Sequence, residues 1–124
     1  MVVVGKRGVL AWTKTLAGAV LAESKAIPHD SKWWNLIGYE ITFPSAYTGN
    51  ITFTKVVADT VNEVDQPYRV FPEAGCTKMA LFDINSPIFM ASDGDSITVA
   101  SSAAITGKVE ITLHYEADSS PGYV

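Results

Sequence analysis

Cysteine and histidine are scarce in this chain of 124 residues, and their scarcity excludes several kinds of site. The single cysteine, Cys76, cannot form a disulfide within the chain, so stability must come from packing. The two histidines, His29 and His114, lie far from each other and from Cys76 in sequence, which leaves too few ligands for a zinc site. We therefore expect no metal, no cofactor and no thiol chemistry.

Basic residues are also few. Nine Lys and Arg stand against thirteen Asp and Glu, which gives a net charge of -4 and a pI near 5.0. Such a balance provides no basic surface for nucleic acid. No apolar run reaches the roughly 18 residues that cross a bilayer. Lys14 interrupts the apolar stretch near the N-terminus, so we expect no signal peptide. We predict neither nucleic acid nor a membrane as a partner.

Motifs for catalysis are absent as well. The chain has no Gly-x-Ser-x-Gly nucleophile elbow, and its glycine-rich segment 5–8 lacks the spacing of a phosphate-binding loop. Glu40, Glu110 and Glu116 fall on the outward faces of predicted strands, where carboxylates usually serve solubility. The segment 93–95 (DGD) fits a tight turn better than a calcium loop. We predict a protein that is not an enzyme.

What the chain has in abundance is period-two alternation of apolar and polar residues, the pattern of a half-buried strand. The segments with this pattern or with strand-forming composition are 37–43, 51–54, 68–71, 79–82, 88–90, 96–99 and 109–116. Turn signals separate them, including Thr106-Gly107 before the last segment. Strands at intervals of roughly ten residues predict an all-β fold, an antiparallel jelly-roll-like β-sandwich.

The first 35 residues fit two interpretations. Apolar residues from Val9 to Val20 recur at helical spacing, but 10–16 also alternates as a strand does. Because the rest of the chain is β, we favour strands, with a turn at Ala17-Gly18 that leads into 19–23.

The N-terminus is predicted to form an arm. Val2, Val3 and Val4 are β-branched residues at a free end, and such a segment tends to pair with a sheet edge of its own chain or of a neighbour. We predict an arm over residues 1–10, a sandwich domain over 11–118 and a flexible tail over 119–124, where Ser, Pro and Gly are frequent.

Aromatic residues near the predicted strand ends are further candidates for function. Trp33 and Trp34 are adjacent, so in extended chain only one of them can face the core. Three interpretations remain open: plugs for the open end of the sandwich, contacts between subunits, or a sugar-binding platform. The platform would comprise Trp33, Tyr47 and Tyr68. The candidate interface residues are Val2, Val3, Val4, Trp12, Trp33, Tyr47 and Tyr68.

The order of these segments supports a resemblance. The pieces that carry it are 36–43, 50–53, a strand pair at 79–90, GDSITV at 94–99 and GKVEITLHYE at 107–116. This succession resembles small jelly-roll structural proteins of tailed-bacteriophage virions. The resemblance implies a homo-oligomer, often a trimer, that decorates or stabilises a capsid through contacts with itself and with proteins such as the major capsid protein. It also implies that Val2, Val3 and Val4 contact neighbouring subunits.

We therefore expect a non-enzymatic structural protein located in the virion. The alternative is a receptor- or glycan-binding module of a tail or fibre. No catalytic residue is carried over from the resemblance.

Overall fold

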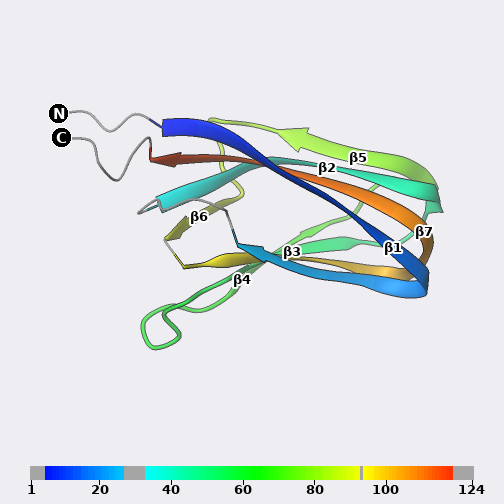
Figure 1. Ribbon diagram of the computed structural model, residues 1–124, viewed down its shortest axis with the longest axis horizontal. Helices are drawn as coiled ribbons and strands as arrows, with labels where there is room; N and C mark the ends of the chain where they lie inside the picture. Colours follow the sequence, from blue (N-terminus) through cyan, green and yellow to red (C-terminus); the bar gives the residue numbers. More distant parts are fainter. Residues whose placement is uncertain (1–4, 27–32, 93, 119–124) are drawn as a thin grey trace.

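The computed structural model describes residues 5–26, 33–92 and 94–118 (Figure 1). Its strands are β1 (Gly5–Ala26), β2 (Trp33–Tyr47), β3 (Ile51–Val56), β4 (Gln66–Val70), β5 (Cys76–Phe82), β6 (Phe89–Ser92) and β7 (Ser96–Asp118). Every strand pair is antiparallel. The predicted all-β, antiparallel, jelly-roll-like sandwich is confirmed. In the described part of the chain, no helix is long and apolar enough to cross a membrane.

β7 is the central strand, and it belongs to two layers. Its first half pairs with β3 on one side and with the second half of β1 on the other. Its second half pairs with β2 and with the first half of β1. β4 extends the first layer beyond β3, whereas β5 and β6 lie end to end along β2 in the second. We call these the β3 layer and the β2 layer.

Both long strands bend where one layer passes into the other (Figure 1). Leu16 pairs with Gly107 at this point, and the register shifts next to Gly18. Gly18 and Gly107 have φ values of 69° and 119°, which side chains rarely tolerate. A Cβ on Gly107 would also lie 2.7 Å from Cβ of Pro44. The turn predicted at Thr106-Gly107 is therefore wrong, because the glycine lets β7 bend while its pairing with β1 continues.

The core fills the space between the two layers. Alternate residues of β7 face inward from Ile97 to Ala117, with no change of phase across the bend. The rings of Tyr39 in β2 and Phe53 in β3 meet between the layers at 4.7 Å. Burial of each large aliphatic side chain stabilises the fold by roughly 1.5–3 kcal/mol. The side chains that are less than 2% exposed are Leu21, Leu36, Ile37, Ile41, Ile51, Phe53, Ile97, Val99, Val109, Ile111 and Leu113.

The boundary predicted between an arm and the domain falls inside β1. Residues 5–10 pair with 113–118 of β7, so they are part of the β2 layer. Leu10 packs against the core. Pairing within the chain satisfies the backbone groups that a free arm would leave to solvent or to a neighbour. The rest of the predicted arm, with Val2, Val3 and Val4, and the predicted tail lie outside the described residues.

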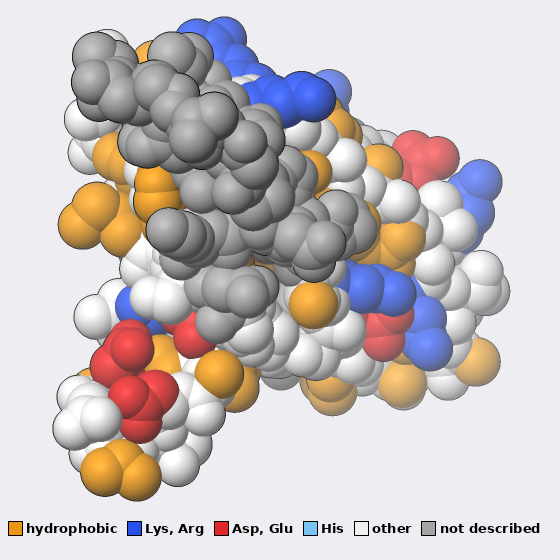
Figure 2. Space-filling model, turned by 60° about the vertical axis from the view of Figure 1, so that its left-hand side comes forward, with side chains coloured by type: hydrophobic (Ala, Val, Ile, Leu, Met, Phe, Trp, Pro, Cys, Tyr) orange, Lys and Arg blue, Asp and Glu red, His pale blue; other side chains and the backbone are white. Residues whose placement is uncertain are grey.

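The connection between β3 and β4, residues 57–65, projects from the molecule. We call it the knob. It leaves the β3 layer at the end where β3 stops, and Figure 2 shows acidic and apolar side chains gathered on the projecting lobe. β4 and β1 lie at opposite edges of the β3 layer, because the strand order there is β4, β3, β7 and β1. Val56, which precedes the knob, pairs with Ser96, and Ser96 pairs with Ala26 at the end of β1, so the knob begins two strands away from β1.

Candidate interaction surfaces

β1 is an edge strand in both layers (Figure 1). Over its 22 residues it pairs with β7, and among the residues that the structure describes no other strand lies along it. About half of its backbone N–H and C=O groups point away from β7, and such a row is a template for another strand. No proline interrupts β1, and residues 15–22 carry no charge. β1 is thus a long edge that can accept a partner.

The two layers are separated by a gap along β1, and we call this the β1 side. Residues from the two halves of β1 meet across the gap. The Lys25 ammonium lies 5.3 Å from the centre of the Trp12 ring. The Lys14 ammonium and the Glu23 carboxylate are 3.9 Å apart. The indole N–H of Trp12 is buried and has no hydrogen-bond partner within the described residues. Trp12, a predicted interface residue, is partly buried here and helps to close this side of the core.

Aromatic rings close the opposite side, between β4 and the strands β5 and β6. Tyr68 of β4 meets Phe89 of β6 edge to face, with ring centres 6.4 Å apart. Burial raises the pKa of Tyr39 above its usual value of 10.0, and the nearby Tyr68 hydroxyl adds to the increase. Tyr68 is 37% exposed, so it is a rim residue that packs against the core.

The structure does not bring the predicted sugar platform together. Trp33 and Tyr47 are the first and last residues of β2, and a strand of 15 residues spans roughly 45 Å. Tyr47 is 4% exposed, and its ring stacks on that of Phe43 at 4.4 Å. Its hydroxyl donates a hydrogen bond to the Asn50 carbonyl at 2.7 Å. The prediction of Tyr47 as an exposed platform residue is wrong, because its ring fills the core and its hydroxyl is hydrogen-bonded internally.

The adjacent tryptophans divide between two environments, as the alternation predicted. Trp34 is 3% exposed and belongs to the core. Trp33 points to the other face, is partly buried, and pairs through its backbone with Ser92 of β6. Trp33 is therefore the more accessible member of the pair.

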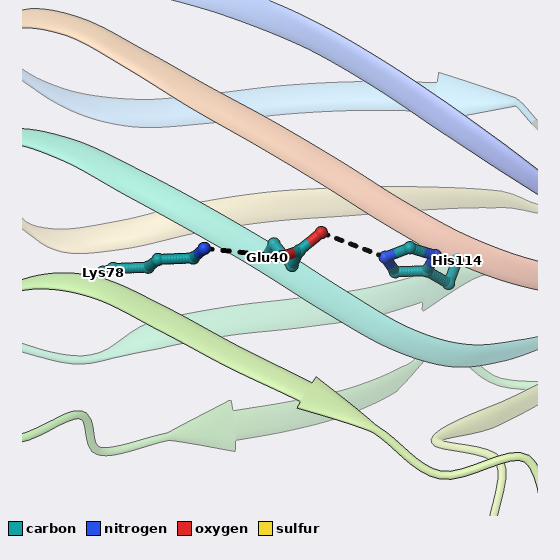
Figure 3. Close-up of polar contacts among 3 residues, drawn as sticks. All are labelled: Glu40, Lys78 and His114. Atoms are coloured by element: carbon teal, nitrogen blue, oxygen red, sulfur yellow. Dashed lines mark hydrogen bonds and ion pairs between the residues drawn. The ribbon is translucent and has the colours of Figure 1, made fainter.

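The outer face of the β2 layer carries a polar cluster from three neighbouring strands (Figure 3). Glu40 of β2 lies between His114 Nε2 at 3.2 Å and the Lys78 ammonium at 3.6 Å. The hydrogen bond with His114, followed by the charge of Lys78, holds the pKa of Glu40 below 4.5. An open groove of about 350 Å³ runs beside it past Thr42 and Glu110. A general acid for glycoside hydrolysis needs the opposite shift, so Glu40 here is an ion-pair partner.

An aromatic side chain lies next to this cluster. Phe82 of β5 extends over Gly38 of β2 and meets His114 edge-on, with ring centres 5.5 Å apart. A Cβ on Gly38 would come within 2.5 Å of the Leu81 carbonyl oxygen, so this close approach requires glycine. The Arg7 guanidinium lies 5.8 Å from the Phe82 ring. The glycine inside an otherwise alternating strand was the sequence signal for this contact.

A buried lysine joins the layers and was missed from the sequence. Lys55 is 6% exposed, and its ammonium donates a hydrogen bond to the Met90 carbonyl at 3.0 Å. Strict alternation after Ile51 and Phe53 places Lys55 on the inner face of β3. The charge of Lys55 favours the outer face. The Met90 carbonyl that accepts its hydrogen bond is distant in sequence, so no local pattern predicts the contact.

The predicted turn at 93–95 is held by Asp95. This residue is 3% exposed, and its carboxylate accepts hydrogen bonds from the backbone N–H groups of Ser92 and Ala58 at 2.9 and 3.0 Å. Both carboxylate oxygens are therefore engaged by the backbone, which is a turn-stabilising role. Asp93 lies outside the described residues.

Comparisons with known proteins find little similarity. No family model matches the chain, and no curated protein matches it. Among solved structures, one described as "Bacillus endospore appendages form a novel family of disulfide-linked pili" aligns with 94% of this chain and 89% of its own. The sequence identity is 17% and the TM-score is 0.39, so the likeness is distant.

Proposed function

We propose that this protein is a non-enzymatic structural subunit of a virion that decorates or stabilises a capsid. In this role it associates with copies of itself, as a homo-oligomer such as a trimer, and with other virion proteins such as the major capsid protein. The observation that carries the proposal is the edge of β1: over 22 residues this strand pairs with β7, and no other strand among the described residues lies along it.

The β1 edge supports association because backbone hydrogen bonds alone can attach a partner segment there. Native proteins usually protect long edges with proline, charge or a covering segment. β1 has no proline, and its middle third, residues 15–22, has no charge. Its first end is basic, with Lys6 and Arg7, whereas Lys25 at the other end lies two residues from Glu23; the strand as a whole therefore favours a partner that is neutral or acidic.

The scaffold supports the same role. β1 and β7 run through both layers, so neither layer can move away from the other without breaking strand pairs. A particle protein needs such a stiff body to hold its contacts in register. The glycan-binding alternative loses its main support, because Tyr47 is buried and lies far along β2 from Trp33.

The experiment places a lysine on the edge. Ala22→Lys adds a charge to an exposed position of β1, and Ala74→Lys adds the same charge to an exposed loop position as a control. We expect sedimentation velocity to show an oligomer for the parent and for Ala74→Lys, and a monomer for Ala22→Lys whose circular dichroism spectrum matches that of the parent.

Removal of residues 1–4 tests the valines separately. These residues precede β1, so the strand pairs of β1 with β7 remain after the deletion. We expect weaker association with capsid particles and an unaltered fold. A parent protein that stays monomeric at all concentrations and does not bind capsid particles would contradict the proposed function.

A further inference from the structure

Charge is divided unevenly between β1 and the rest of the molecule. β1 holds four basic residues and one acidic residue, a net charge of +3 in a chain whose net charge is -4. Three of these basic side chains, those of Lys6, Lys14 and Lys25, lie on the same face of β1, the face that borders the gap on the β1 side. The partly buried Trp12 lies among them, with Lys25 against its ring. This side of the molecule is therefore basic and aromatic.

The knob has the opposite character. Residues 57–65 include three acidic residues and no basic residue, a net charge of -3. Val61 is 89% exposed and Val64 is 77% exposed, so both are almost fully in solvent. Single exposed apolar residues are ordinary on a surface, but two such residues at the tip of a projection suit a contact.

Hydrogen bonds hold the knob in one shape. The Asp59 carboxylate accepts from the backbone N–H groups of Val61 and Asn62 at 3.1 and 3.2 Å. The Glu63 N–H donates to the Asp59 carbonyl at 3.1 Å, which closes one helical turn. Val61 lies within this turn, and Val64 follows it directly. A surface that is already ordered loses little entropy when it binds.

The two surfaces are formed at different edges of the molecule. β4, which the knob precedes, and β1 are opposite edges of the β3 layer. The knob projects from the sheet, so it is placed to reach the β1 side of a second copy (Figure 1). Because the surfaces differ, the contact is heterologous, and repeated application produces a ring or an open chain.

From this complementarity of charge and position, we infer that the β1 side binds the acidic knob of a second copy of this chain. The knob carboxylates lie against the lysines of β1, and the exposed valines cover the Trp12 ring and the uncharged middle of the strand. The inference rests on the proposed function and names its partner surface. Attraction between exposed charges weakens as salt screens it, so the association is salt-dependent.

A charge-swap experiment tests the pairing. Glu63→Lys makes the knob less acidic, and Lys14→Glu places an acidic residue on β1. By sedimentation velocity, we expect each variant alone to self-associate at least tenfold more weakly than the parent. An equimolar mixture recovers association, because each altered surface then meets an oppositely charged one. Glu73→Lys, on an exposed loop outside both surfaces, is the control and associates as the parent does.

A second variant tests the apolar part of the contact. Val61→Ser combined with Val64→Ser keeps the charge of the knob and removes its exposed apolar groups. We expect at least a tenfold loss of association. At concentrations where both proteins are monomeric, the thermal unfolding midpoint should match that of the parent, because both valines are exposed.

The outcomes separate this inference from the proposed function. If Ala22→Lys abolishes association while the knob variants associate as the parent does, the knob is not the partner and the β1 proposal stands. Absence of recovery in the Glu63→Lys and Lys14→Glu mixture also contradicts the inference. A parent that neither self-associates nor binds particles overturns both.

Discussion

The two layers of the folded sheet are separated by a gap on each of two opposite sides, and different kinds of side chain fill these gaps. On one side a single strand, β1, borders both layers, and a lysine, an ion pair and a partly buried indole meet across the gap. On the other side the bordering strands are short, and the rings of Tyr68 and Phe89 meet. Aromatic pairs contribute about 0.5–1.5 kcal/mol beyond the area that they bury, whereas exposed ion pairs contribute about 0–1 kcal/mol.

The difference suggests that the two sides have different roles. The aromatic side excludes water and stabilises the fold. The β1 side leaves backbone groups and charged side chains available, which costs some stability and suits association. Substitutions at Phe89, Trp12 and Glu23 test this division, in order of decreasing expected effect, and Glu40 serves as a reference.

Truncation of the aromatic side should have the largest effect. Phe89 is 4% exposed, so Phe89→Ala removes a buried ring and leaves a cavity. We expect a loss of about 3–4 kcal/mol in the free energy of unfolding, measured by urea denaturation. Phe71→Ala is the control, because Phe71 is 74% exposed, and it should change stability by less than about 0.5 kcal/mol. Equal losses of unfolding free energy for Phe89→Ala and Phe71→Ala would contradict the stabilising role of the aromatic side.

Substitution of Trp12 should have an intermediate effect that depends on the replacement. Trp12→Ala removes a partly buried ring that packs on the core, and we expect a loss of about 1–2 kcal/mol. Trp12→Phe keeps an aromatic ring and removes a buried N–H group that has no partner in the described part of the chain, so its loss should be below about 1 kcal/mol. Urea denaturation of both variants measures the difference. A Phe variant as unstable as the Ala variant would show that the indole N–H is hydrogen-bonded.

Neutralisation of the ion pair on the β1 side should change stability little. Lys14 and Glu23 are 3.9 Å apart, and the Lys14 side chain is 46% exposed. We expect Glu23→Gln to cost less than about 0.5 kcal/mol and the cost to fall further at high salt. Thermal unfolding at two salt concentrations measures both effects. A loss above about 1 kcal/mol would indicate that this side also contributes to the core.

Glu40 offers a reference point on the outer face, away from both open sides. Its pKa is below 4.5 in the folded protein, so its stabilising contribution is present above the unfolded value and is lost as pH falls through the lower folded pKa. We expect a small decrease in the thermal midpoint below about pH 4.5 that Glu40→Gln reduces. NMR titration of the Glu40 carboxyl measures the pKa directly, and a value at or above 4.5 would contradict the assignment.

The sequence predicted what depends on local periodicity. Strands at 37–43 and 109–116 were identified because their alternation is uninterrupted, and β7 keeps that alternation on both sides of its bend. The bend was predicted as a turn, because Gly107 signals a positive φ in either case. Only the approach of Pro44 from another strand distinguishes a bend within a strand from a turn between strands, and that contact is not local.

Longer-range features could not be predicted in this way. Residues 5–10 looked like an arm because their partner, 113–118, lies about a hundred residues away along the chain. Tyr47 looked accessible because its ring partner and its hydrogen-bond acceptor depend on how β2 ends. The proposed contact could be predicted only in part. The charges of β1 are evident from the sequence, but the position of β1 at the edge of the sheet is not.

The central position of β7 has a consequence for how the chain folds as it is synthesised. β1, β2 and β3 all pair with this strand, and it is the last of the described strands to leave the ribosome. Until it emerges, the earlier strands lack their main partner and expose edges that aggregate readily. We expect both layers to form together, after synthesis of β7, and the nascent chain to need protection until then.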